Sequence, residues 1–333
     1  MKNPVHIIAE AGTNHNANPE TAKKLVSVAK ESGADSVKFQ IIYPEGLYLS
    51  EFFENGKYTP NEVFEMRRAG MLTDKQWEEV SAFSQDAGIP FTASVFDQRG
   101  IDFLDKLDAP YLKIASCDLN NYPLIEAAAE RNRPLVLSTG MSQLWEVEKA
   151  VEAATKKSTA PVILLHCVSR YPCPPDQTQL TFIKVLKESF GVQVGFSDHT
   201  ESNIAAVAAV AMGATWLEKH FTLDRKSKGF DHAYAMEPDG LASYVADVRA
   251  ISEAVSPHFP KVHQDESTVK QRARRSLYAK RNIEAGETLT ADDVLIVRPE
   301  GAFVPDDLQR LTGRKVTRAI SRFEPLNGDM FEG

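Results

Sequence analysis

Short apolar runs alternate along the first 255 residues with longer stretches in which apolar residues recur at helical spacing. Runs of Val, Ile, Leu, Phe or Ala are typical of buried parallel strands, and their alternation with helices is typical of βα units around a parallel sheet. The pattern predicts eight strands, which begin near Val5, Ser36, Pro90, Tyr111, Leu135, Val162, Val192 and Thr215. Helical spacing is clearest in Pro19–Ser32, Trp77–Ala87, Tyr122–Arg131, Leu144–Ala154, Leu180–Glu188, Asn203–Ala211 and Leu241–Val255.

Eight strand–helix units within about 255 residues match the size of a (β/α)8 TIM barrel, and a doubly wound open sheet is the alternative. The barrel is expected over residues 1–256. Two prolines followed by a run of polar residues indicate a linker over residues 257–270. A second domain is expected over residues 271–333.

The second domain shows short β-type runs separated by turn residues rather than helical spacing. The runs are Leu277–Ala279, Val294–Val297 and Val316–Ala319. They predict a small β-rich module. Because so short a chain buries little apolar surface, such a module would gain stability by docking on its own barrel or on a partner.

Composition narrows the class of protein without naming a function. The chain has 43% hydrophobic and 25% charged residues, as ordinary globular proteins do, and its net charge of −8 argues against general nucleic-acid binding. Its three cysteines form no Cys-x-x-Cys pair, which favours a reducing compartment. We see no signal peptide and no apolar stretch near 18 residues, so we expect a cytoplasmic protein without a membrane segment.

Lysine and serine residues recur where the predicted strands end, which is where a TIM barrel assembles its active site. Lys38 and Lys113 end two strands, and a lysine there either forms a Schiff base or binds an anion. The nearby hydroxyls favour a cradle for phosphate and carboxylate groups; they belong to Ser94, Ser116, Ser138 and Ser197. For each lysine alone, a solvated side chain is the alternative without a function.

Two histidines, His199 and His220, end neighbouring predicted strands. Their imidazoles can converge on one point, and such a pair suits an exchangeable divalent metal ion with open coordination positions. Glu10 ends the first strand, where its carboxylate could act as a general base or proton carrier. Structural histidines, and a Glu10 that only neutralises the lysines, remain alternatives. Asp231 lies in a loop after the eighth strand and could orient substrate hydroxyls, or be an ordinary loop residue.

These motifs, taken together and in this order, resemble the sialic acid synthase family. In the barrel region they are Ile8-Ala9-Glu10-Ala11-Gly12, Val37-Lys38-Phe39-Gln40, Tyr111-Leu112-Lys113-Ile114-Ala115-Ser116, Ser138-Thr139-Gly140-Met141, Ser197-Asp198-His199-Thr200 and Glu218-Lys219-His220. The tail resembles that family's antifreeze-like (SAF) domain, through Arg275-Ser276-Leu277-Tyr278-Ala279, Ala285-Gly286-Glu287 and Arg298-Pro299. The resemblance covers nearly the whole chain.

The resemblance implies a transferase that forms a carbon–carbon bond. It would condense phosphoenolpyruvate with an N-acetylated hexosamine, N-acetylmannosamine in the type reaction, and water to give a nonulosonic acid and phosphate. The phosphoenolpyruvate site would comprise Lys38, Ser94, Lys113, Ser116, Ser138 and Ser197. His199 and His220 would bind Mn²⁺ or Mg²⁺, and Glu10 would direct the water. The sugar would contact Gln40, Tyr171, Asp231 and, from the neighbouring subunit of a domain-swapped homodimer, Arg298.

Two departures from the family pattern concern the acceptor. The loop over residues 41–60 does not match the commoner family sequence, and the family's Arg-Pro-Gly here reads Arg298-Pro299-Glu300-Gly301. Synthases of legionaminic and pseudaminic acid are therefore open alternatives. The rival functions are a Schiff-base sialic acid lyase and a non-catalytic carbohydrate-binding protein.

Overall fold

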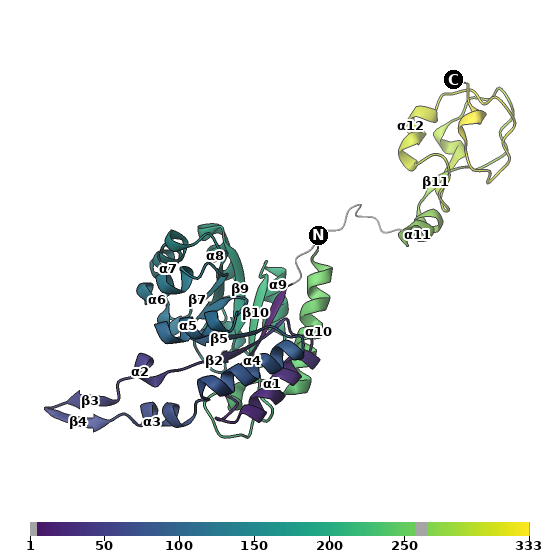
Figure 1. The fold of residues 1–333 in the computed structure, drawn as a ribbon. Coiled ribbons are helices and arrows are strands. Elements are labelled where there is room, and N and C mark those ends of the chain that lie inside the picture. Colours follow the sequence, from purple (N-terminus) through teal and green to yellow (C-terminus); the bar gives the residue numbers. More distant parts are fainter. Residues whose placement is uncertain (1–4, 257–264, 333) are drawn as a thin grey trace. The chain divides into compact units, whose positions relative to one another are not determined.

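A closed barrel of parallel strands forms the larger of two compact units, residues 1–256 and 257–333 (Figure 1). The structure is a computed structural model that describes residues 5–256 and 265–332. The barrel strands are β1 (His6–Gly12), β2 (Ser36–Gln40), β5 (Phe91–Val95), β6 (Leu112–Ile114), β7 (Leu135–Ser138), β8 (Val162–Cys167), β9 (Gln193–Asp198) and β10 (Trp216–His220). Their order around the barrel is β1-β10-β9-β8-β7-β6-β5-β2.

The barrel confirms the predicted fold class. Strand β1 pairs in parallel with both β2 and β10, which closes the sheet and excludes the doubly wound alternative. The sequence placed the eight strands well because strands covered on both faces are continuous apolar runs.

One helix follows each barrel strand and covers its outer face. These helices are α1 (Pro19–Glu31), α4 (Asp74–Asp86), α5 (Gln98–Lys106), α6 (Tyr122–Ala129), α7 (Leu144–Lys157), α8 (Phe182–Phe190), α9 (Ile204–Ala211) and α10 (Pro238–Ala254). Helix α1 shows why such segments form. The Asn18 side chain accepts hydrogen bonds from the first free N–H groups, Pro19 presets the helical backbone, and Leu25 and Val26 are fully buried against the barrel.

The interior of the barrel is packed rather than open. A cluster of apolar side chains fills it below the carboxyl ends of the strands: Ile8, Tyr111, Val136, Ile163 and Leu165, with Trp216 beside them. A larger core lies between the outer faces of the strands and the helices. The polar side chains at the carboxyl ends of the strands therefore lie on an apolar floor.

An insertion between β2 and α4 contains elements that the sequence did not reveal. They are α2 (Pro44–Leu47), the antiparallel strands β3 (Glu51–Glu54) and β4 (Lys57–Pro60), and α3 (Glu62–Ala69). The hairpin projects away from the barrel (Figure 1). Because β3 and β4 are exposed along their whole length, they lack the buried-face alternation that would have marked them as strands.

The second unit has a core of its own, which includes Leu277, Leu289, Val316 and Phe331. Two of the three predicted runs form the antiparallel pair β11 (Ser276–Ala279) and β12 (Val294–Val297), and α12 (Leu308–Leu311) adds a short helix. The expected strand over 316–319 is not formed: Val316 makes an isolated bridge to Phe331 instead.

The predicted linker differs from the structure in its second half. Residues 257–264 lie outside the described residues, and Glu266–Ala273 form helix α11, whose side chains are exposed. Across the described parts of the chain, no helix is long and apolar enough to cross a membrane.

Candidate active site

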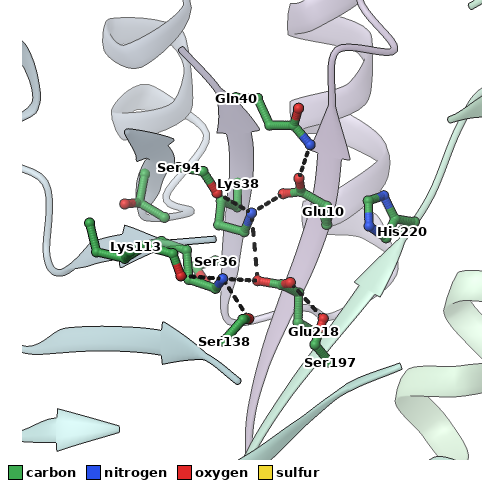
Figure 2. A network of polar contacts seen from close by, with 12 residues as sticks. Glu10, Ser36, Lys38, Gln40, Ser94, Lys113, Ser138, Ser197, Glu218 and His220 are labelled. Carbon is green, nitrogen blue, oxygen red and sulfur yellow. Dashed lines mark hydrogen bonds and ion pairs between the residues drawn. The ribbon is translucent and has the colours of Figure 1, made fainter. Parts of the chain in front are cut away.

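A cavity of about 500 Å³ opens at the carboxyl ends of the barrel strands. It brings together all twelve site residues predicted in the barrel: Glu10, Lys38, Gln40, Ser94, Lys113, Ser116, Ser138, Tyr171, Ser197, His199, His220 and Asp231. Figure 2 shows how several of these side chains converge from different strands. This location is what a TIM barrel predicts for chemistry. The individual roles of the residues stay predictions.

Lys38 stands between two buried carboxylates. Its Nζ lies 2.6 Å from Glu10 Oε2 and 3.5 Å from Glu218 Oε2 (Figure 2). It also donates a hydrogen bond to Ser94 Oγ at 2.9 Å. Because these contacts satisfy the ammonium group, it can remain charged in a buried position.

Lys113 forms the second half of the same cluster. Its Nζ donates to Ser138 Oγ at 2.7 Å and to the Ile114 carbonyl at 3.0 Å, and it lies 4.0 Å from Glu218 Oε2. Ser197 in turn donates to Glu218 Oε1 at 2.9 Å. The hydrogen bonds and the carboxylate favour the ammonium form of Lys113, which can bind an anion, whereas burial opposes that charge.

The two carboxylates share these lysines but differ in proton affinity. Burial raises the pKa of Glu10 above its ordinary value, against the opposing charge of Lys38. Burial also acts on Glu218, but the charges of Lys113 and Lys38 outweigh it and lower the pKa of Glu218. Glu218 is therefore the permanent counter-ion, whereas Glu10 is the carboxyl group with the greater tendency to hold a proton.

The two lysines also differ in proton affinity. Burial alone would lower the pKa of Lys38, but the neighbouring Glu10 and Glu218 outweigh it and raise that pKa. For Lys113, burial prevails over the attraction of Glu218, and the pKa is lowered. An arriving dianion would strengthen the ammonium form of Lys113, because opposite charge favours the protonated state.

His199 and His220 line the same cavity and converge on each other, with ring centroids 5.6 Å apart. His199 Nδ1 donates to the Val168 carbonyl at 2.7 Å, which leaves the Nε2 lone pair available. Burial and the neighbouring His220 lower the pKa of His199 to about 3, so the ring is neutral, as metal ligation requires.

These two imidazoles fit a divalent ion whose other positions are open. His220 Nδ1 is buried without a hydrogen-bond partner, and the carbonyl that fixes His199 is the usual support of a ligating ring. Within residues 5–256 and 265–332, no group of three or more His, Cys, Asp or Glu side chains forms a closed metal cage. The donor set therefore suits an exchangeable ion rather than a structural one.

A third group of side chains lies beside the histidines. Tyr234 donates from its hydroxyl to Asp231 Oδ1 at 2.6 Å, and Asp231 Oδ2 lies 3.9 Å from His220 Nδ1. The Tyr171 ring lies over His199, with centroids 4.0 Å apart, and Gln40 Nε2 donates to Glu10 Oε1 at 3.1 Å. Aromatic faces with amide and carboxylate groups are suited to a polyhydroxylated ligand.

Ser116 occupies a tight corner of the cavity. Its Oγ accepts a hydrogen bond from the Gly140 backbone N–H at 3.0 Å and lies 3.2 Å from Cys167 Sγ. A Cβ on Gly140 would lie 2.8 Å from this oxygen, so glycine is required for the close approach.

The one predicted site residue outside the cavity is Arg298, which is exposed after β12 in the other unit.

Sequence reasoning missed two residues that the geometry makes prominent. Glu218 lies two positions before His220 on β10, so the two side chains share a face, and this period-two spacing could have indicated it. Tyr234 ends a 3-10 helix of three residues (His232–Tyr234), which is too short to leave a periodic signal, and only the fold places its hydroxyl on Asp231.

Comparisons with known proteins show the family to which the chain belongs. The NeuB family matches residues 25–258, and the SAF domain matches residues 274–332. The chain is 33% identical to the N,N'-diacetyllegionaminic acid synthase of Legionella pneumophila, over 95% of this chain and 91% of that protein. It is 35% identical to the N-acetylneuraminate-9-phosphate synthase of Mus musculus, over 99% of this chain and 94% of that protein.

A solved structure supports the same relationship. The N-acetylneuraminic acid synthetase of Leptospira borgpetersenii, in complex with citrate, superposes with a TM-score of 0.72 and 34% identity, covering 80% of this chain and 90% of that one. Together with the match of the family over most of the barrel, these relatives identify the chain as a member of the NeuB family with a C-terminal SAF domain.

Proposed function

We propose that this protein condenses phosphoenolpyruvate with an N-acetylated amino sugar and water, giving a nonulosonic acid and phosphate. The observation that carries the proposal is the pair of buried ammonium groups of Lys38 and Lys113, each bonded to a serine, in the same cavity as the His199–His220 pair. Relatives named as synthases of legionaminic acid and N-acetylneuraminate 9-phosphate support it.

In this proposal the cationic cluster holds phosphoenolpyruvate. Its phosphate and carboxylate would replace part of the lysines' present interactions with Glu10 and Glu218, because a phosphate dianion attracts ammonium groups more strongly than a single carboxylate does. The cradle consists of Lys38, Lys113, Ser94, Ser116, Ser138 and Ser197. The same cations would stabilise the phosphate as it leaves.

The acceptor would bind in its open-chain form, with its aldehyde near His199 and His220. Mn²⁺ or Mg²⁺ held by these two imidazoles would act as a Lewis acid and make the aldehyde carbon electrophilic. Gln40, Tyr171 and Asp231 would orient the hydroxyl groups of the sugar, and the Tyr234 hydroxyl would hold Asp231 in place.

Glu10 would act on the water molecule. The enol carbon C3 of phosphoenolpyruvate attacks the aldehyde carbon, and the positive charge that develops at C2 is relieved by water as Glu10 accepts its proton. The resulting tetrahedral carbon expels phosphate together with the bridging oxygen, so the C–O bond breaks, and C2 becomes a ketone as its hydroxyl loses a proton. The former aldehyde oxygen takes up a proton and becomes a hydroxyl group. The raised pKa of Glu10 makes it a better base for this step than an ordinary carboxylate.

Three further features belong to the proposal. The two subunits would form a domain-swapped homodimer. Arg298 would then reach the N-acetyl group of the acceptor bound in the neighbouring subunit. The enzyme would act in the cytoplasm. Substituting Arg298 by Ala should then raise the KM for the sugar more than the KM for phosphoenolpyruvate. Equal effects on both would contradict that role.

Isotope labelling tests the reaction. Phosphoenolpyruvate with ¹⁸O in the bridging position should release ¹⁸O-labelled phosphate only when an amino sugar is added, and EDTA should stop the release until Mn²⁺ or Mg²⁺ is restored. Covalent trapping of pyruvate on Lys113 or Lys38 by borohydride would instead indicate the Schiff-base lyase. Acceptor-independent release, or none with any N-acetylated hexosamine, would refute the proposal.

A further inference from the structure

Arg67, on helix α3 of the insertion, forms part of the wall of the catalytic cavity. The same side chain lines a second cavity of about 380 Å³, which lies between α3, the loop after β1 and the loop after β10. Lys228 and Phe230 line this second cavity too. Arg67 therefore stands where the two cavities adjoin, and no step described so far uses it.

The guanidinium group of Arg67 is held in place, but its charge is not neutralised. Its Cζ lies 3.6 Å from the centre of the Phe230 ring, and Nη1 donates to Thr13 Oγ1 at 3.3 Å. Its Nε is buried without a hydrogen-bond partner, and among the described residues no acidic side chain pairs with it. The adjacent Arg68 is different: its side chain is 60% exposed and pairs with Glu65 at 2.9 Å.

The position of Arg67 corresponds to the far end of the proposed acceptor site. Thr13, which fixes the guanidinium, follows Gly12 in the chain. A Cβ on Gly12 would lie 2.7 Å from Asp231 Oδ2 and 3.3 Å from Gln40 Nε2, so both proposed sugar-binding residues adjoin this turn. Phe230, beneath the guanidinium, directly precedes Asp231. An acceptor on Gln40 and Asp231 would thus extend toward Arg67.

We propose that Arg67 binds a phosphate monoester on the terminal carbon of the acceptor, with Lys228 as the second cation. A guanidinium fork stacked on an aromatic ring presents fixed donors that match phosphate oxygens. A partly buried cation with an unpaired donor is costly, and an anionic substrate would supply the missing partner. This inference rests on the proposed synthase function and specifies its substrate.

The phosphate ester takes no part in bond making. Condensation joins the three carbons of phosphoenolpyruvate to the aldehyde end of a six-carbon acceptor, so a phosphate on carbon 6 of the acceptor becomes a phosphate on carbon 9 of the product. The phosphate released comes from phosphoenolpyruvate. Arg67 would therefore act through binding and specificity.

The test compares N-acetylmannosamine with its 6-phosphate, using ketoacid formation by the full-length protein with Mn²⁺. We expect the wild-type kcat/KM to be at least about 10-fold higher for the phosphorylated acceptor, because charge-assisted hydrogen bonds distinguish it. Arg67→Met should reduce this preference by about 10- to 100-fold, chiefly through KM. Arg67→Lys should retain part of it, and Lys228→Ala should have a smaller effect than Arg67→Met.

Arg68→Gln is the matched control, because it removes a neighbouring exposed arginine outside the cavity and should leave the preference unchanged. Equal or higher wild-type kcat/KM for the unphosphorylated sugar would overturn the anion site while leaving the synthase function intact. Failure of both acceptors would instead refute the synthase and its acceptor site together. Calorimetry adds a readout without turnover: the phosphorylated sugar should bind wild type more tightly than Arg67→Met, and equal affinities would contradict the proposal.

Discussion

The carboxyl and amino ends of the barrel both contain buried polar side chains. At the carboxyl end these side chains are charged, whereas the buried hydrogen-bond network at the amino end is neutral. At the carboxyl end Lys38, Lys113, Glu10 and Glu218 are each at most 5% exposed and form a network of ion pairs. At the amino end the buried hydrogen-bond network is neutral: Ser36 joins His6 and Tyr111 through hydrogen bonds of 3.0 and 2.8 Å, and a partly exposed ion pair between Arg249 and Asp35 lies beside it.

Aromatic packing accompanies the neutral network at the amino end. The rings of His6 and Tyr111 lie 4.0 and 5.3 Å from that of Trp216, measured between centroids. Burial lowers the pKa of His6 to about 4, so the imidazole stays uncharged at neutral pH, despite the opposing effect of Asp35. Such a network stabilises without needing a ligand, whereas buried ion pairs gain little net stability. The difference is consistent with the active site that we propose at the carboxyl end.

The largest expected effect comes from removing the central cation of the carboxyl end. Lys38→Met should lower kcat/KM for phosphoenolpyruvate by at least about 1,000-fold, because the leaving phosphate loses an electrostatic partner. It should also lower the free energy of unfolding by about 3 kcal/mol, since Glu10 and Glu218 would face each other without the shared cation. Steady-state kinetics and urea unfolding check both. Lys24→Met, at an exposed lysine of α1, is the control and should change neither.

At the same end, Glu10→Gln should lower kcat while leaving the free energy of unfolding nearly unchanged. The amide cannot accept the proton of water, so kcat should fall by about 100- to 1,000-fold. Burial already disfavours the ionised form of Glu10, so the neutral amide should change the free energy of unfolding by less than about 1 kcal/mol. Stopped-flow kinetics with calorimetric unfolding tests this separation, and unchanged kcat would remove Glu10 from the reaction.

At the amino end the corresponding test is acidification. The folded pKa of His6 lies below its unfolded value of 6.5, so the unfolded state binds more protons and stability falls as the pH drops from about 6.5 toward 4. His6 alone should account for about 1 to 2 kcal/mol between pH 7 and pH 5. Other buried histidines contribute as well, so the measurement is the difference in pH dependence between wild type and His6→Gln. Parallel curves would contradict the prediction.

The smallest expected effect is that of Tyr111→Phe. This change removes the hydrogen bond to Ser36 and keeps the ring packing, so it should cost about 1 kcal/mol of unfolding free energy. Because Tyr111 lies at the end remote from the chemistry, kcat should stay within about twofold of wild type. A large loss of kcat would show that the two ends are coupled through the barrel.

The comparison also shows which features could be predicted from the sequence. The strands and most strand-end side chains could, because a strand buried on both faces leaves a continuous apolar run and its polar end residues stand out. The hairpin β3–β4 could not, since it is exposed along its whole length, and helix α3 could not, since Phe64 is its one buried residue and a single position shows no helical period. Arg67 therefore lay beyond the loop expected over residues 41–60, in a stretch for which the sequence predicted no element, and nothing local linked it to Phe230 or Thr13.

The order of side-chain types along the chain by itself determined a parallel barrel and the chemical groups at its rim, since hydrophobic periodicity and strand ends are local properties. Tertiary structure alone decided that Glu218, and not a distant surface acid, neutralises Lys38 and Lys113, and that Glu10 keeps the higher proton affinity. The physical reason is that both Coulomb attraction and desolvation depend on distances and burial, which exist only after the barrel closes.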